Sequence, residues 1–128
     1  MCSSDLLRAD EHLARHALAD LFLDTLPYNA HTTASDALWA GLPVLSCRGT
    51  TFPGRVGASL LHALGLADEL LVDDVPAFEA RAIGLARDRA RLARVRERLA
   101  LARTTAPLFD TPATCAALAR AYEDMLAR

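Results

Sequence analysis

Residues 21–46 read LFLDTLPYNAHTTASDALWAGLPVLS, and this run alternates between two kinds of secondary structure. Its apolar start at 21–23 predicts a buried strand, which is followed by a loop with a proline and an asparagine. A helix then begins at the threonine pair 32–33, one of which caps it, and Gly41 ends it. Because a second strand follows at 44–46, the loop lies at the carboxyl end of a parallel strand, where open α/β sheets bind ligands.

The start of this helix has the chemistry of an anion site. Its first turn has N–H groups without partners and a partial positive charge, both of which suit a phosphate. The side chains of His31, Thr32 and Thr33 add hydrogen-bond donors at the same end. Asp36 shares a helical face with the threonines, and its carboxylate repels phosphate but accepts bonds from two neighbouring sugar hydroxyls. The pattern therefore predicts a nucleotide, with its phosphate at the helix start and its ribose beside Asp36.

The same run resembles the nucleotide-binding segment of the O-linked N-acetylglucosamine transferase family, glycosyltransferase family 41, which includes SPINDLY-like proteins. The family's pattern is roughly L-D-T-x-x-x-N-G-H-T-T-x-x-D-x-L-W-x-G-x-P, and this chain departs from it at Ala30, where the family usually has Gly. The resemblance continues through GTTFPGRVGASLL at 49–61 and APLFDT at 106–111. It covers nearly the whole chain from Glu11 onward and corresponds to the last part of the family's catalytic region.

The resemblance implies an α/β fold, the Rossmann-like C-terminal half-domain of a GT-B glycosyltransferase, with a short parallel sheet, helices and a helical C-terminal segment. It implies UDP-N-acetylglucosamine as donor and a Ser or Thr of a protein as acceptor. It implies neither a metal nor another cofactor, because helix N-termini and side-chain donors stabilise the leaving diphosphate in this fold class. His31, Thr32 and Thr33 would have that role. Family relatives also use GDP-fucose and UDP-glucose, so these residues leave the donor sugar open.

A second resemblance precedes the first strand. Residues 9–18 predict a short helix, and EHLAR at 11–15 resembles the family's E-H-x-x-R segment, whose His and Arg lie near the uracil. By that resemblance, His12 and Arg15 contact the base. The alternative is that both belong to the solvated polar face of an amphipathic helix, and the sequence alone leaves the two readings open.

Parts of the family's active site are absent from this sequence. In the family, a lysine that neutralises the diphosphate lies upstream, and the acceptor side belongs to the other domain. This chain contains no Lys. We therefore expect 1–128 to be a single partial domain of a longer enzyme, missing its N-terminal GT-B domain and its upstream tetratricopeptide repeats. Such a piece should bind its donor weakly and should not transfer a sugar alone. We expect residues 1–8 to be non-native or disordered.

The composition excludes several kinds of partner and compartment. The net charge of −2 predicts no attraction to nucleic acid. No apolar run is long enough to cross a bilayer and no signal peptide is visible, so we expect a cytoplasmic protein without a membrane partner. The three cysteines are scattered and lack C-x-x-C spacing, which indicates neither a zinc site nor a disulfide framework and fits a reducing compartment.

The rest of the chain predicts a third strand followed mainly by helices. The strand is expected at 70–72, and one aspartate of the pair Asp73 and Asp74 should cap the helix that follows, since two carboxylates alone are weak evidence for a metal site. Helices are expected at 54–64, at 76–88 and onward to 103, and at 111–125.

Two groups of arginines require an interpretation. Arg55 begins the helix at 54–64, where the helix dipole disfavours a cation, so we expect an anion beside it and favour a structural carboxylate over the ligand. The segment 87–98 contains six arginines beside an apolar stripe at Leu92, Val95 and Leu99, which favours a solvated arginine face over a nucleic-acid surface.

Two other function classes compete with the transferase reading. A UDP-N-acetylglucosamine 2-epimerase-like GT-B enzyme also places a phosphate-binding helix and a ribose carboxylate here, but the H-T-T-x-x-D-x-L-W run argues against it. A non-catalytic helical interaction module would use the helix-rich second half of the chain. It leaves unexplained the strand-loop-helix-strand arrangement at 21–46 and its polar loop. Nucleotide titration separates the module from both enzymes, and the products of the longer protein separate the two enzymes.

Overall fold

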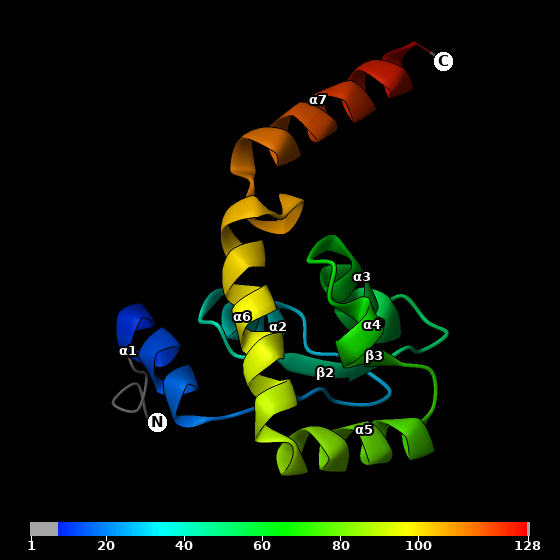
Figure 1. Cartoon of the computed structure of the whole chain (residues 1–128). Coiled ribbons are helices and arrows are strands. Elements are labelled where there is room, and N and C mark those ends of the chain that lie inside the picture. The colour runs from blue at the N-terminus through cyan, green and yellow to red at the C-terminus, as the bar shows by residue number, and fades with distance from the viewer. Residues whose placement is uncertain (1–7, 128) are drawn as a thin grey trace, which may run out of the picture.

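Three short parallel strands form the sheet in the order β1-β2-β3 (Figure 1). In this computed structural model, which describes residues 8–127, β1 is Phe22–Leu23, β2 is Val44–Cys47 and β3 is Leu71–Val72. Phe22 pairs with Val44 and Ser46 pairs with Leu71, both in the parallel sense. The predicted parallel strands are therefore confirmed, and their carboxyl ends lie at one edge of the sheet, as the ligand-site argument requires.

The strands differ in burial according to their place in the sheet. All four residues of β2 are buried, because it is the central strand. The prediction of a buried strand at 21–23 is wrong, since Leu23 is 52% exposed and Leu21 and Phe22 are half-buried. The reason is that β1 is an edge strand with one hydrogen-bonded neighbour.

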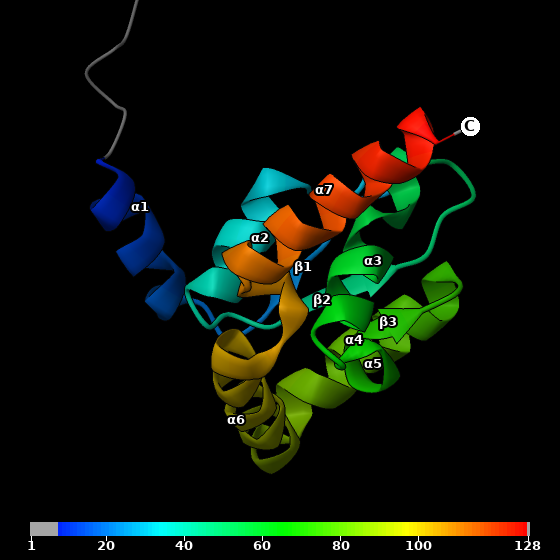
Figure 2. The same cartoon turned by 90° about the horizontal axis from the view of Figure 1, so that it is seen from above.

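Helices cover both faces of the sheet. Viewed from above, α2 and α3 lie in front of the strands and α5 lies behind them (Figure 2). The helices are α1 Ala9–Ala14, α2 Thr32–Trp39, α3 Val56–Ala63, α4 Ala67–Leu70, α5 Val75–Arg87, α6 Arg89–Thr105 and α7 Thr111–Leu126. Short 3-10 turns occupy η1 Arg15–Leu18, η2 Pro53–Arg55 and η3 Pro107–Phe109. The predicted helices are confirmed with small shifts in their bounds, whereas the single turn α4 was not predicted.

The core lies where these helices meet the sheet. Fully buried leucines come from five helices: Leu38 of α2, Leu61 of α3, Leu70 of α4, Leu85 of α5 and Leu99 of α6. The predicted stripe of α6 is confirmed, since all three of its members are buried. Gly41 and Gly65 follow the ends of α2 and α3 with φ of 88° and 66°, the left-handed conformation that glycine tolerates best at a helix end.

Aspartates cap the three helices of the second half. Asp74 accepts a hydrogen bond from the Ala77 N–H at 2.7 Å, and the same N-cap role belongs to Asp88 in α6 and Asp110 in α7. The predicted aspartate cap is thus confirmed, and of the pair 73–74 it is Asp74 that forms it. Its neighbour Asp73 lies 3.4 Å from Arg48 Nε, so the acidic pair has two separate structural partners.

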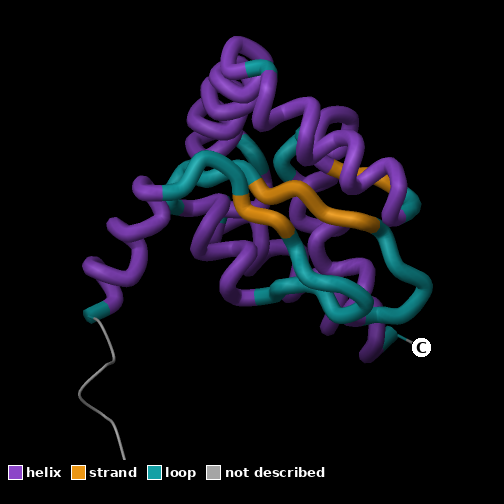
Figure 3. The backbone as a smooth tube through the Cα atoms, turned by 90° about the horizontal axis from the view of Figure 1, so that it is seen from below, coloured by secondary structure: helices purple, strands orange, loops and turns teal. Residues whose placement is uncertain are grey.

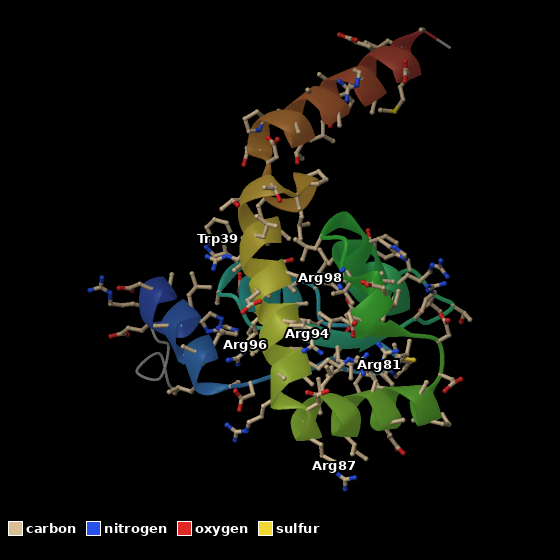
Figure 4. All side chains as sticks on the ribbon, viewed as in Figure 1. Trp39, Arg81, Arg87, Arg94, Arg96 and Arg98 are labelled. Atoms are coloured by element: carbon tan, nitrogen blue, oxygen red, sulfur yellow. The ribbon has the colours of Figure 1, made fainter. Side chains whose placement is uncertain are left out.

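Four of the six arginines at 87–98 are exposed, as the prediction of a solvated arginine face requires, and the other two, Arg91 and Arg96, are half-buried. Arg91 Nη2 lies 2.7 Å from a carboxylate oxygen of Glu69, and Arg98 binds Asp68 with two bonds of 3.0 Å. Arg96 donates to the Ala19 and Asp20 carbonyls ahead of β1. Figure 4 shows Arg96 and Arg98 extending from α6 toward these neighbours, whereas Arg87 points away from the molecule.

The last helix has little contact with the rest of the described chain. α7 extends away from the sheet and its covering helices (Figure 1), and its described residues are all exposed. Its largest apolar side chains include Leu118, Tyr122 and Met125, at 53%, 61% and 61% exposure. Across residues 8–127, none of the helices combines the length and the apolar character needed to cross a membrane. The prediction for residues 1–8 falls, apart from Arg8, outside the described residues.

Candidate functional site

A buried carboxylate organises the loop after β1. Asp24 is only 5% exposed, and its Oδ1 accepts the Thr25 N–H at 2.8 Å and the Ala30 N–H at 2.7 Å. These two donors are at opposite ends of the loop 25–30, so one oxygen closes it. The other oxygen accepts the Ser46 hydroxyl of β2 at 2.5 Å. Asp24 therefore fixes the loop to the central strand, a role that the sequence prediction missed although the aspartate directly follows the strand.

The interior of this loop is also hydrogen-bonded. The Thr25 hydroxyl donates to the Tyr28 carbonyl at 2.6 Å, and the Asn29 amide donates to the Thr25 carbonyl at 3.1 Å. Asn29 is 1% exposed, and its Oδ1 has no hydrogen-bond partner among the described residues. The loop is therefore a packed unit in which the backbone is held by side chains.

Helix α3 packs directly against the Asp24 carboxylate. A Cβ added at Gly57 would lie 2.6 Å from Asp24 Oδ2 and 2.9 Å from Ser46 Cβ, and closer still to Ser46 Oγ. Real Cβ atoms do not approach other atoms this closely, so only glycine fits at this position. The absence of a side chain at Gly57 brings α3, β2 and the loop after β1 together.

A second loop, 48–55, packs beside the first. The Gly49 N–H donates to the Gly54 carbonyl at 2.6 Å, and the Asn29 N–H donates to the Pro53 carbonyl at 3.1 Å. Figure 3 shows the two loops together at the edge where β1 and β2 end. The start of α2 is therefore supported by two loops, each of which follows a strand.

The predicted anion-binding residues surround the first turn of α2. The prediction that Thr32 or Thr33 caps this helix is wrong, because His31 is the N-cap and makes no side-chain capping bond. The threonines are instead the first two helical residues, and both are exposed. The first helical N–H bond runs from Ser35 to the His31 carbonyl at 3.1 Å, so the three N–H groups before it have no acceptor within the helix.

Aromatic side chains hold the His31 ring in place. The ring stacks on Tyr28, with centroids 4.9 Å apart and planes 18° apart, and meets Phe52 edge-on at 6.5 Å. Its Nε2 lies 3.4 Å from the Pro53 carbonyl oxygen. In the tautomer with the proton on Nε2, the ring donates to this carbonyl. The 48–55 loop then determines which ring nitrogen is left to face a ligand.

The structure also brings two of the predicted base and ribose residues together. His12 Nε2 of α1 lies 3.7 Å from Asp36 Oδ2 of α2, and both side chains are about one-third exposed. Arg15 at the end of α1 is exposed, and no polar contact among the described residues joins it to the other predicted site residues. His12 of α1 and Asp36 of α2 thus form one group. His31, Thr32 and Thr33 form a second group at the start of α2.

Cys47 lies at the end of β2, near this edge of the sheet. Its side chain is buried, which confirms its interpretation as a small hydrophobic residue. Burial raises the pKa of the Cys47 thiol, and the nearby carboxylates of Asp74 and Asp73 raise it further. The thiol is therefore neutral and poorly nucleophilic.

The prediction of a carboxylate partner for Arg55 is wrong. This side chain donates to the Gly49 carbonyl at 3.4 Å, and no carboxylate of the described residues lies within ion-pair distance of it.

Metal ligation is unsupported within residues 8–127, where no three His, Cys, Asp or Glu side chains are grouped to hold an ion. The arrangement around α2 suits an elongated ligand, with an anionic group at the helix start and hydroxyl groups one turn along.

Comparison with known proteins gives one consistent family match. A model of glycosyl transferase family 41 matches residues 1–118. The chain is 37% identical over 122 residues to a probable UDP-N-acetylglucosamine–peptide N-acetylglucosaminyltransferase, SEC, of Arabidopsis thaliana, covering 95% of this chain and 12% of that protein. It is 37% identical to the corresponding Caenorhabditis elegans transferase, covering 88% of this chain and 10% of that protein.

A solved structure gives the same result for the fold. A mutant O-GlcNAc transferase of Thermobaculum terrenum superposes with a TM-score of 0.83 at 37% identity, covering 94% of this chain and 23% of that one. The predicted GT-B C-terminal half-domain is thereby confirmed. The chain spans only about a tenth of the length of these curated relatives.

Proposed function

Because this chain belongs to glycosyl transferase family 41, we propose that it is the donor-binding part of a longer protein O-GlcNAc transferase-like enzyme. The enzyme would move N-acetylglucosamine from UDP-N-acetylglucosamine to a Ser or Thr hydroxyl of a protein acceptor. Both matched relatives are named as transferases of N-acetylglucosamine from UDP-N-acetylglucosamine to a peptide. The structural support is the first turn of α2, which contains two exposed threonines and N–H groups without acceptors in the helix. The loop that leads into this turn is fixed by Asp24.

The diphosphate of the donor would lie at this helix start. The N–H groups of the first turn and the hydroxyls of Thr32 and Thr33 can donate to its oxygens, and His31 adds a ring nitrogen beside them. Their effect is largest in the transition state, when the bond to the sugar breaks and negative charge grows on the leaving phosphate. The packed loops 25–30 and 48–55 keep these donors in place before the ligand arrives. Neither a metal nor another cofactor has a part in this proposal.

The nucleoside would extend from the helix start toward α1. Asp36, one turn along α2, would accept hydrogen bonds from the ribose hydroxyls, and His12 at 3.7 Å from it would help orient the carboxylate. His12 and Arg15 would contact the uracil, on the opposite side of the ribose from the diphosphate. The pairing of His12 with Asp36 supports a common ligand for α1 and α2.

The remaining parts of the enzyme would belong to the longer protein. We propose that this protein supplies an N-terminal GT-B domain with the acceptor side of the cleft, and tetratricopeptide repeats upstream of it. It would act in the cytoplasm on protein acceptors, without nucleic acid or a membrane as partner. The 128 residues would then be one partial domain that binds the nucleotide weakly and needs the other domain for transfer.

Titration of two ligands tests the site. UDP and uridine are titrated into the 128-residue chain, followed by calorimetry or NMR, because they differ only in the diphosphate. Thr33→Val and His31→Ala should weaken binding of UDP while leaving uridine nearly unchanged, and Thr104→Val, an exposed threonine of α6, should change neither. In the longer enzyme, the same two variants should lower turnover with every UDP-sugar. The loss of turnover should exceed the fraction of enzyme that the substitutions unfold, which a thermal melt measures.

Two results would contradict the proposal. A folded chain that binds neither UDP nor uridine would favour the non-catalytic interaction module. Equal losses for both ligands in Thr33→Val would place the diphosphate elsewhere. Glycosylated protein as the product of the longer enzyme would distinguish the transferase from an epimerase.

A further inference from the structure

A recess that contains none of the predicted site residues is lined by α3 and by the 48–55 loop. It has a volume of about 570 Å³, which is in the range of ligand-binding pockets. Its apolar wall includes Phe52, Val56 and Leu60, and its polar lining includes Arg48, Arg55 and His62. The lining includes two guanidinium groups and an imidazole but no carboxylate, so the recess has a positive character.

The charge of the recess is only partly compensated within the described residues. Arg48 Nε lies 3.4 Å from Asp73 Oδ1, in an exposed pair that water weakens. Arg55 has only the Gly49 carbonyl at 3.4 Å and no carboxylate among the described residues. It also stands at the N-terminus of α3, where the helix dipole adds positive potential. An anionic group brought to Arg55 would therefore satisfy both the guanidinium and the helix start.

The recess is next to the proposed donor site. Phe52 lines it and also meets the His31 ring edge-on at 6.5 Å, so one aromatic side chain separates the two. Both are formed by the 48–55 loop, at the edge of the sheet where β2 ends. A group in the recess would consequently lie beside the leaving diphosphate rather than on a remote surface.

From this geometry we propose that the recess binds an acidic side chain of the protein acceptor, a Glu or Asp near the Ser or Thr that receives the sugar. Arg55 and Arg48 would pair with its carboxylate, because guanidinium groups bind carboxylates through paired N–H groups. Phe52, Val56 and Leu60 would contact the aliphatic part of the peptide. This inference rests on the proposed function: the N-terminal GT-B domain would supply the main acceptor side of the cleft, and the recess would add a contact from this chain to a residue that flanks the acceptor Ser or Thr.

Binding of matched peptides to the 128-residue chain, which contains the whole recess, tests the inference. The probes are a short synthetic peptide with a serine flanked by glutamates and the same peptide with glutamines. The glutamate peptide should bind about tenfold more tightly, by a margin that shrinks as salt is raised. Arg55→Gln should remove this preference, Arg55→Lys should restore part of it, and Arg87→Gln should leave it unchanged because Arg87 points away from the molecule (Figure 4).

UDP binding to the same samples separates the two proposals. Arg55→Gln should keep the affinity for UDP, so loss of peptide preference with intact UDP binding supports the inference. Equal binding of the two peptides by a chain that binds UDP would overturn the inference and leave the proposed function standing. No UDP binding by the unaltered chain would count against the proposed function instead.

Kinetics of the longer enzyme provide a second readout. Arg55→Gln should raise KM for the acidic peptide about tenfold with little change in kcat, and should leave KM for the neutral peptide and for the donor unchanged. A lower melting temperature together with unchanged peptide selectivity would mean that the recess is filled by a carboxylate of the enzyme itself, which would also overturn the inference.

Discussion

Replacing Gly57 by alanine tests the contact on which the donor loop depends. The new Cβ would lie 2.6 Å from Asp24 Oδ2 and 2.9 Å from Ser46 Cβ, and closer still to Ser46 Oγ. Neither neighbour can move freely, because Ser46 is fully buried in the central strand and Asp24 closes the loop 25–30. The substitution therefore either displaces α3 or breaks the 2.5 Å bond between the Ser46 hydroxyl and the carboxylate.

Opposing contributions determine the size of the effect. Alanine in place of glycine in a helix stabilises by up to about 1 kcal/mol, and by less in the first turn, where Gly57 lies. Overpacking costs about 1–3 kcal/mol. A buried hydroxyl and carboxylate that lose their mutual bond add about 1–3 kcal/mol. The cost exceeds the gain, and we expect Gly57→Ala to lower the free energy of unfolding by about 2–4 kcal/mol.

Urea unfolding of the 128-residue chain measures this change, with Gly84→Ala as the matched control. Gly84 is in α5, and a Cβ added there would meet no atom within 4 Å, so the same substitution should stabilise by roughly 0.5–1 kcal/mol. Adding Ser46→Gly to Gly57→Ala should recover part of the loss, since it removes the nearest obstruction. If both alanine variants stabilised the chain equally, the close packing of α3 on Asp24 would be refuted.

Three further predictions concern other parts of the chain. Asp36→Asn should weaken UDP and uridine equally, by about 1–3 kcal/mol for the loss of charge-assisted bonds, with little change in apo melting temperature because Asp36 is partly exposed; a large stability loss with unchanged affinity would contradict this. Hydrogen bonds from Arg98 lower the pKa of Asp68, so the pair stabilises the fold above the pKa of an unfolded aspartate, about 3.9, and this contribution is lost as pH falls through the folded value. Because the pair is exposed, Asp68→Asn should cost under about 1 kcal/mol at neutral pH, and the cost should vanish in acid urea titrations. Cys47 is buried and the pKa of its thiol is raised, so it should react with a thiol reagent far more slowly than the exposed Cys115. Mass spectrometry of the labelled peptides measures the two rates. Equal rates would show that β2 opens readily.

The sequence predicted the sheet well because its signals are local. The apolar segments at 44–46 and 70–72 and the glycines after α2 and α3 report on residues close in the chain, and the structure has the strands and helix ends there. The burial of β1 was not predictable in the same way. Whether an apolar strand is central or at an edge depends on the order of strands, which periodicity does not encode.

The site was predicted in part, and the omissions have a common cause. The residues of α2 follow one another in sequence and share one face, so their grouping was accessible from spacing alone. Asp24 was missed because its partners are Ser46, beyond the next helix, and the backbone of its own loop. The lack of a carboxylate partner for Arg55 among residues 8–127 was equally invisible, since an ion pair depends on segments distant in the chain.

The ion pairs that hold α6 have a consequence for chemical modification. All the cationic side chains apart from histidine are arginines, and Arg91, Arg96 and Arg98 join this helix to α4 and to the segment before β1. A guanidinium remains protonated throughout the physiological pH range, and it is not a substrate for acetyl transfer to an ε-amine. Enzymes that acetylate lysine therefore have no side chain in this sequence on which to act, and they cannot detach α6 by neutralising its charge.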